Sequence, residues 1–452
     1  MKMKIFHAAT ANLRRSALFI LLGLVSQAIA SDQIPAPPQD RPIALTGATI
    51  HTISGETIQD GIILFDQGVI TAIGTDVKIP DEAEVIELPG RHVYPGLIAA
   101  NGTLGLIEIS AVRATLDFSE TGDVNPNVRA EAAFNPGSEL LPVARANGTT
   151  LALSVPTGGL ISGTSALMMM DGWTWEDMVI KAPVGLHIDW PDMRIFSNAK
   201  KSEQDQKKER DDQIEKIYQA FADARAYMKA KEGESLKGVP YHDTDSRWEA
   251  MIPVLKGEIP VFVAADEIRQ IEAAVDWASE EDIKIVIVGG YDAWRVTDLL
   301  KEKDVPVVIT EIHRLPARRW EGYDTPFTLP LKLHEAGVRF CISGVGSSFD
   351  AANERNLPYH AATAAAYGLP KKEALKSITL YPAEILGVSE LVGSLEVGKD
   401  ATLIVTDGDP LEIITQVEME FIQGREIDLS SRHTQLYEKY REKYRQMGII
   451  ED

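Results

Sequence analysis

The densest group of side chains that could bind a small ligand lies between residues 106 and 131. Its polar members are Glu108, Arg113, Asp117, Glu120, Asn125, Asn127 and Arg129. Arg113 and Arg129 could clamp a carboxylate, because guanidinium groups bind carboxylates through two parallel hydrogen bonds. Alternatively, ion pairs within the segment would only hold the loop in shape. The sequence leaves both interpretations open.

Histidine, the commonest metal ligand, is scattered through the sequence. No His-x-His or His-Glu-x-x-His pattern occurs. His313 is the best-placed histidine because it follows a buried strand, although a lone histidine in a surface loop is the more common case. Asp350 could supply a carboxylate nearby or cap the next helix. No Gly-x-Ser-x-Gly elbow of a serine hydrolase is present.

The elements that must position these residues alternate between strands and helices. Between about residues 93 and 387, apolar strands such as 260–264 precede helical segments such as 267–279. Repeated strand–helix units indicate parallel strands joined by crossover helices. We therefore predict an α/β fold with a (β/α)8 barrel over residues 93–392, whose binding site lies at the carboxyl ends of the strands.

Both ends of the chain contain short strands separated by turn residues, over residues 42–92 and 393–428. Asp66-Gln-Gly68 has the composition of a hairpin turn. Neither segment alone has enough strands to bury a core. We expect the two segments to form one small β-sandwich, into which the barrel is inserted.

Two further segments are helical by their apolar spacing. Residues 198–237 form a charged insertion, in which 10 of the 13 residues from Lys200 to Asp212 are charged. An apolar stripe follows at helical spacing, so a helix should pack there, either on this chain or on a partner. Residues 429–452 are predicted to be a helical tail.

The amino-terminal residues 1–30 are typical of a signal peptide, with four basic residues, a short apolar run and the small residues Ala28 and Ala30. Residues 31–41 are a proline-rich linker. We expect export, with a periplasmic location. The net charge of −22 argues against nucleic acid and anionic membranes as partners. The single cysteine, Cys341, excludes an intramolecular disulfide.

Three motifs resemble the metal-dependent amidohydrolase superfamily, in particular its imidazolonepropionase-like branch. The first is Val93-Tyr-Pro-Gly-Leu-Ile98. The second is Ile378-Thr-Leu-Tyr-Pro-Ala-Glu-Ile-Leu-Gly387, followed by Val392-Gly-Ser-Leu-Glu-Val-Gly-Lys-Asp-Ala401, and the third is Leu403-Ile-Val-Thr-Asp-Gly-Asp-Pro410. The resemblance covers about residues 42–428. It implies a distorted (β/α)8 barrel with a composite sandwich, and hydrolysis of non-peptide C–N bonds by metal-activated water.

The positions at which the family carries its metal ligands hold other residues. The His-x-His expected after the first strand is replaced by Asn101 and Thr103. The two later histidine positions hold Ala264 and Gly289, and the aspartate position holds Gly344 or Val345. Lys181 lies where a bridging lysine would be expected, but it would have nothing to bridge. We therefore expect no tightly bound metal, and zinc only if an atypical site exists.

Two function classes follow from these observations. The first is an amidohydrolase-like hydrolase with a degenerate metal site, and the second is an inactive periplasmic barrel that binds a ligand or partner. The predicted ligand-binding residues are Asn101, Thr103, Arg113, Arg129 and His313. The expected partner is a small molecule. The sequence does not decide whether the chain also forms a homo-oligomer.

Overall fold

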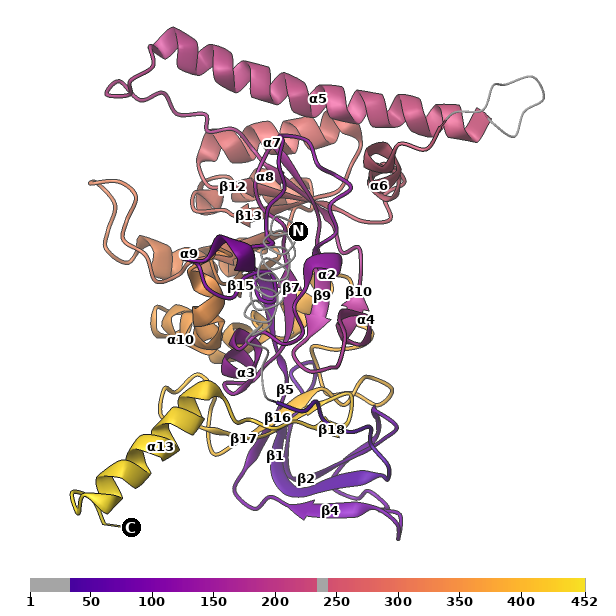
Figure 1. Cartoon of the computed structure of the whole chain (residues 1–452), viewed down its shortest axis with the longest axis vertical. Coiled ribbons are helices and arrows are strands. Elements are labelled where there is room, and N and C mark those ends of the chain that lie inside the picture. Colours follow the sequence, from indigo (N-terminus) through magenta and orange to yellow (C-terminus); the bar gives the residue numbers. More distant parts are fainter. Residues whose placement is uncertain (1–32, 234–242, 452) are drawn as a thin grey trace, which may run out of the picture. The chain divides into compact units, whose positions relative to one another are not determined.

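The computed structural model describes residues 33–233 and 243–451, and the described residues from Ile34 onward form one compact unit. The signal peptide predicted over residues 1–30 lies outside the described residues. The fold mixes α-helices and β-sheets, and the described strands form three sheets (Figure 1).

Strands from both ends of the chain share the first sheet. The order is β18-β17-β16-β5-β1-β2-β3, with β4 paired to β1. The bounds are β1 (Ile43–His51), β2 (Thr57–Asp66), β3 (Val69–Gly74), β4 (Glu84–Glu87), β5 (His92–Pro95), β16 (Leu403–Thr406), β17 (Val417–Ile422) and β18 (Arg425–Glu426). The antiparallel pairing of β16 with β5 joins the two chain ends and is visible in Figure 1.

An apolar core of its own stabilises this sheet. The rings of Phe65 and Phe421, from opposite ends of the chain, meet edge to face with centroids 5.2 Å apart. Gln67 and Gly68 between β2 and β3 have φ of +49° and +81°. Positive φ at both central residues is the geometry that matches the twist of a two-residue hairpin.

Two further sheets contain parallel pairs among β6–β7 and β11–β15, and antiparallel pairs that involve β8, β9 and β10. One has the order β10-β9-β7-β6 and the other β15-β14-β13-β12-β11-β8. Their bounds are β6 (Leu97–Gly102), β7 (Thr149–Ser154), β8 (Ile161–Thr164), β9 (Ala166–Met169), β10 (Val179–Lys181), β11 (Leu186–Asp189), β12 (Val261–Ala265), β13 (Ile285–Gly289), β14 (Val307–Thr310) and β15 (Phe340–Ser343). β6 and β15 contact each other, and Ser343 Oγ donates to the Asn101 carbonyl at 3.2 Å.

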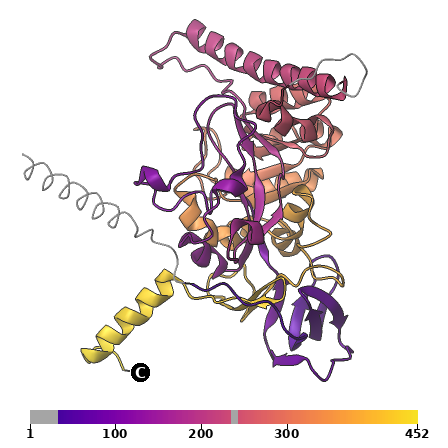
Figure 2. The same ribbon diagram turned by 45° about the vertical axis from the view of Figure 1, so that its right-hand side comes forward.

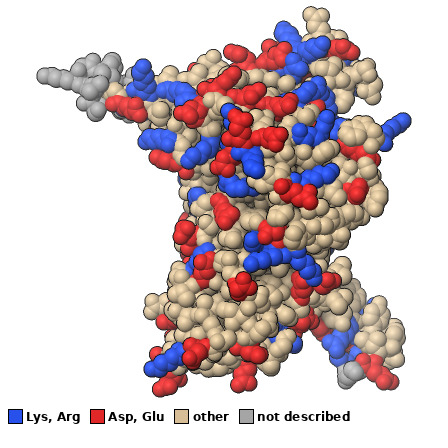
Figure 3. Space-filling model, turned by 180° about the vertical axis from the view of Figure 1, so that it is seen from behind, with Lys and Arg blue, Asp and Glu red and all other residues tan. Residues whose placement is uncertain are grey.

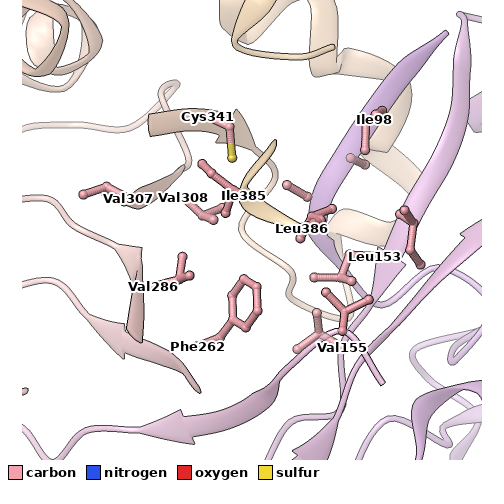
Figure 4. Packing of buried hydrophobic residues seen from close by; sticks show 14 of the residues in the cluster. Ile98, Leu153, Val155, Phe262, Val286, Val307, Val308, Cys341, Ile385 and Leu386 are labelled. Atoms are coloured by element: carbon pink, nitrogen blue, oxygen red, sulfur yellow. The ribbon is translucent and has the colours of Figure 1, made fainter. Parts of the chain in front are cut away.

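Helices follow most of the parallel strands, as the alternation predicted. They are α2 (Ala130–Ala133), α3 (Leu140–Arg145), α4 (Trp175–Met178), α6 (Ser246–Leu255), α7 (Ile268–Glu281), α8 (Thr297–Glu302), α9 (Thr325–Ala336), α10 (Leu357–Ala366), α11 (Lys371–Lys376) and α12 (Leu380–Ile385), with 3-10 turns η1 (Arg113–Thr115), η2 (Ala293–Arg295) and η3 (Asp350–Asn356). Figure 4 shows side chains of β6, β7 and β12–β15 gathered in one apolar cluster.

The charged insertion forms α5 (Glu203–Gly233), which lies beside α6 and α7 in Figures 1 and 2. The first turns of α5 are largely exposed, whereas Ile217 and Phe221 are fully buried. The Phe221 ring packs edge to face on Trp277 of α7 with centroids 5.0 Å apart. The apolar stripe of this helix therefore packs on its own chain. The last residues of the predicted insertion lie outside the described residues.

A buried charge network ties three regions together around Asp171. Its carboxylate accepts hydrogen bonds from Arg145 Nη1 at 2.9 Å and from Arg425 Nη1 at 3.0 Å. The backbone N–H of Ala36 donates to the same carboxylate at 3.0 Å. Asp171 and Arg145 are both 4% exposed. The network links the linker, the central sheets and the carboxyl-terminal strand β18.

The tail forms α13 (Arg432–Gln446), and none of its residues is buried. On the face shown in Figure 3, Lys and Arg lie interspersed with Asp and Glu. Among the described residues, no helix combines the length and apolar character that crossing a bilayer would require.

Candidate functional site

The residues at the end of β6 bond to the loop that follows β15. Asn101 Nδ2 donates to the Gly344 carbonyl and Thr103 Oγ1 donates to the Ser347 carbonyl, each at 3.3 Å. Both side chains are buried. Asn101 and Thr103 therefore position the backbone between β15 and η3.

The later metal-ligand positions offer no side chain that could bind a metal. Ala264 and Gly289 lie at the ends of β12 and β13, and Gly344 follows β15. Gly289 has φ of +99°, and a Cβ built there would lie 2.6 Å from Asp266 Oδ1, so a histidine would require local rearrangement. Within residues 33–233 and 243–451, no three His, Cys, Asp or Glu side chains are grouped to hold a metal ion. The residues at these positions do not fit the metal centre that the resemblance implies.

Lys181 lies at the amino ends of the parallel strands, opposite the ends that hold Ala264, Gly289 and Gly344. Its Nζ donates to the Leu386 carbonyl at 2.9 Å and lines a cavity with Lys284 and Pro306, which directly precede β13 and β14. From the sequence, Lys181 is expected where a bridging lysine would lie; its side chain is found at the amino ends of β13 and β14 rather than beside Asn101 and Thr103. Its strand, β10, belongs to an antiparallel pair with β9, which the sequence pattern did not distinguish from a parallel strand.

Glu354 of η3 occupies the space between the ends of β6 and β15. A Cβ built on either Gly102 or Gly344 would lie 2.8 Å from Glu354 Oε1. Glu354 is only 3% exposed, and neither carboxylate oxygen has a hydrogen-bond partner among the described residues. Burial, with a smaller contribution from Asp350, raises the pKa of the Glu354 carboxyl to about 8.

A pocket of about 270 Å³ opens beside Glu354 at the carboxyl ends of β14 and β15. It is lined by Glu311, His313, Gly344, Val345, Asp350, Asn353, Glu354, Asn356, Leu357 and His360. The rings of His313 and His360 stack with centroids 4.3 Å apart. Burial lowers the pKa of both histidines, that of His360 to about 4, so the His360 imidazole is neutral at pH 7. His313 Nε2 lies 2.7 Å from Thr363 Oγ1.

The backbone of this pocket is strained at one position. Glu311, directly after β14, has φ of +54°, a conformation that is unfavourable for a residue with a Cβ. Such strain is concentrated at functional sites. Asp350 Oδ2 accepts from the Val345 N–H at 3.1 Å, so Asp350 fixes the loop after β15.

The two arginines of the predicted clamp lie in the loop between β6 and α2. Arg129 Nε donates to Oε1 of the buried Glu131 at 2.7 Å, and Arg113 lies exposed in η1. Single bridges pair Val124 and Arg129 with β8. Of the five predicted ligand-binding residues, His313 alone lines the pocket beside Glu354.

The sequence did not single out Glu354, Glu311 or His360. Glu354 and His360 follow Asp350 by four and ten residues, within a region that the pattern predicted to be helical. A signal was present in the two glycines Gly102 and Gly344, since only residues without a Cβ leave room for a carboxylate there. The sequence alone does not reveal which side chain fills that space.

Comparisons with known proteins agree with this fold. Residues 327–425 match the model of the Amidohydrolase family. The chain is similar to the crystal structure of an amidohydrolase from Thermotoga maritima MSB8, with a TM-score of 0.75, 28% identity and coverage of 85% of this chain and 99% of that chain. A Xaa-Pro dipeptidase with bound methionine shares the fold, with a TM-score of 0.52, 14% identity and coverage of 86% and 100%.

A curated relative is longer than this chain. The Amidohydrolase tasK of Hapsidospora irregularis is 23% identical in an alignment of 426 positions, and the match covers 84% of this chain and 42% of that protein. The chain thus spans less than half the length of this relative. Together, the family match over residues 327–425, the curated relative and the structural neighbour show that the chain is similar to amidohydrolases.

Proposed function

We propose that this amidohydrolase relative binds a small ligand beside Glu354 and does not use the metal-activated water of its family. What supports the proposal most directly is the Glu354 carboxylate, which lies between Gly102 and Gly344 where the family's ligands would converge. We further propose that the two central sheets together form a distorted (β/α)8 barrel. We also propose that the chain belongs to the imidazolonepropionase-like branch. The proposal includes export to the periplasm, with a small molecule as partner.

Hydrolysis of a non-peptide C–N bond at a degenerate site is the second candidate function. The raised pKa of Glu354 favours it, because a carboxyl group that keeps its proton at pH 7 can protonate a leaving amine. The two candidates are separated by amide turnover of the purified protein with and without added zinc. We expect ligand binding without zinc-dependent turnover, whereas zinc-dependent hydrolysis would contradict the proposal.

The arginine clamp can be tested by its effect on stability. We expect Arg129→Ala to lower the free energy of unfolding by about 1–3 kcal/mol, because the buried Glu131 carboxylate would lose its ion pair. Arg113→Ala should change it by less than about 0.5 kcal/mol, because the side chain is exposed. Urea unfolding measures both. Equal, negligible losses would show that Arg129 does not stabilise the loop and would leave it available to a ligand carboxylate.

A further inference from the structure

The pocket beside Glu354 has a chemistry that points to one class of ligand. Three carboxyl groups line it, those of Glu311, Asp350 and Glu354. No lysine or arginine is among its described lining residues. Arg355, next in the chain to Glu354, donates instead to the Ala352 carbonyl at 3.2 Å. The carboxyl groups therefore have no basic side chain of the pocket as a counter-charge.

The buried carboxylate is the second, independent observation. Glu354 is 97% buried, and both oxygens lack a hydrogen-bond partner within the described residues. A buried acceptor without a donor costs free energy, and a charged one costs more. A ligand that donates hydrogen bonds and carries positive charge would remove this cost.

We propose that this pocket binds a small organic cation, an alkylammonium or alkylguanidinium, through an ion pair with Glu354. This inference rests on the proposed ligand-binding function and names its ligand class. The ammonium or guanidinium group would donate to Glu354, with the Asp350 carboxylate and the Asn353 amide close by. A short aliphatic chain would lie against Leu357 and Val345, which also line the pocket.

The pocket volume sets the size of the ligand. About 270 Å³ corresponds to roughly nine water molecules at liquid density. A ligand of about five to ten non-hydrogen atoms fits this volume. Divalent cations fit less well, because calcium prefers six to eight oxygen ligands and magnesium a regular octahedron. No such cluster of side chains occurs in the described parts of the chain.

Binding should be linked to proton release. The groups that face Glu354 are Glu311 and His313 after β14, Asp350 of η3 and His360 of α10. The empty pocket keeps Glu354 largely protonated at pH 7, since burial raises its pKa to about 8. A bound cation favours the carboxylate, so the Glu354 proton passes to the buffer. Affinity should therefore rise between pH 6 and pH 8.

The experiment is calorimetric titration of the full mature protein at pH 7 and constant ionic strength. The probes are n-butylammonium and n-butylguanidinium, with 1-butanol as the uncharged control. We expect at least one cation to bind, with 1-butanol at least about tenfold weaker. Titration in two buffers of different ionisation enthalpy should show close to one proton released per bound cation.

A matched pair of variants assigns the effect to Glu354. Glu354→Gln keeps the size of the side chain and should weaken cation binding by at least about tenfold and abolish proton release. Glu390→Gln changes an exposed glutamate and should leave binding unchanged. Each protein's folding is checked by circular dichroism, and Glu354→Asp serves if Glu354→Gln does not fold.

Three results would overturn the inference. They are equal binding of 1-butanol and the cations, unchanged cation affinity in Glu354→Gln, and no binding of either cation at millimolar concentration. Equal binding of 1-butanol would leave the proposed ligand pocket standing and would refute only the cation class. The metal content of the protein is independent of all three results.

Discussion

Asp171→Ala is expected to lower the free energy of unfolding by about 3–5 kcal/mol, because it removes the shared partner of two guanidinium groups. Arg145 is 4% exposed and would lose its ion pair with Asp171. The backbone N–H of Ala36 would lose its acceptor as well. Since whole domains are stable by only about 5–15 kcal/mol, this is a large fraction of the total.

Urea unfolding measures this loss, with Asp81→Ala as the control. Asp81 is an exposed aspartate in a turn, and its replacement should change stability by less than about 0.5 kcal/mol. Asp171→Asn keeps acceptor capacity without the charge and should lose less than Asp171→Ala. Equal stability of Asp171→Ala and Asp81→Ala would show that the network does not hold the linker, central sheets and β18 together.

Glu354→Gln is expected to make the ligand-free protein more stable at alkaline pH than the wild type. Burial raises the pKa of Glu354 to about 8 from an unfolded value near 4.5. The folded state therefore binds more protons between these values, and the wild type loses stability as pH rises from about 4.5 to 8. At about 1.4 kcal/mol per pH unit, the loss between pH 5 and pH 8 is about 4 kcal/mol.

The comparison uses thermal or urea unfolding at pH 5, 6.5 and 8. The two proteins should have similar stability at pH 5, with Glu354→Gln gaining progressively as pH rises. Glu390→Gln should follow the wild type at every pH, because Glu390 is exposed. A constant difference between Glu354→Gln and the wild type across this range would mean that Glu354 ionises normally in the folded protein.

Much of the fold could be predicted because its signals are local. The apolar runs that form β12, β13 and β14 reflect strands that are buried on both faces. The helical spacing of apolar residues in α7 reflects a helix that is buried on one face. The hairpin turn at Gln67 and Gly68 could also be predicted from local sequence, because few residue types adopt the positive φ that the turn requires. Pairing of the two chain ends followed from the need for a complete core.

For the site, the sequence was informative only at positions where an expected residue type is replaced by another. Asn101, Thr103, Ala264 and Gly289 led to the prediction that metal ligands are replaced, because metal binding needs particular atoms. The role of Glu354 depends instead on its three-dimensional neighbours, among them Gly102 at the end of β6, which lies far from it in the sequence. The pairing of Arg129 with Glu131 and the position of Lys181 depend likewise on side-chain direction, which spacing does not determine.

The most direct test of the proposed function is the metal content of the protein, purified without chelators and measured by elemental analysis. We expect far less than one zinc, manganese or iron ion per chain, because Asn101, Thr103, Ala264 and Gly289 stand where the resemblance predicts metal ligands. Treatment with a chelator should leave the unfolding temperature unchanged. Stoichiometric metal, placed by anomalous scattering at the carboxyl ends of the parallel strands, would contradict the proposed function.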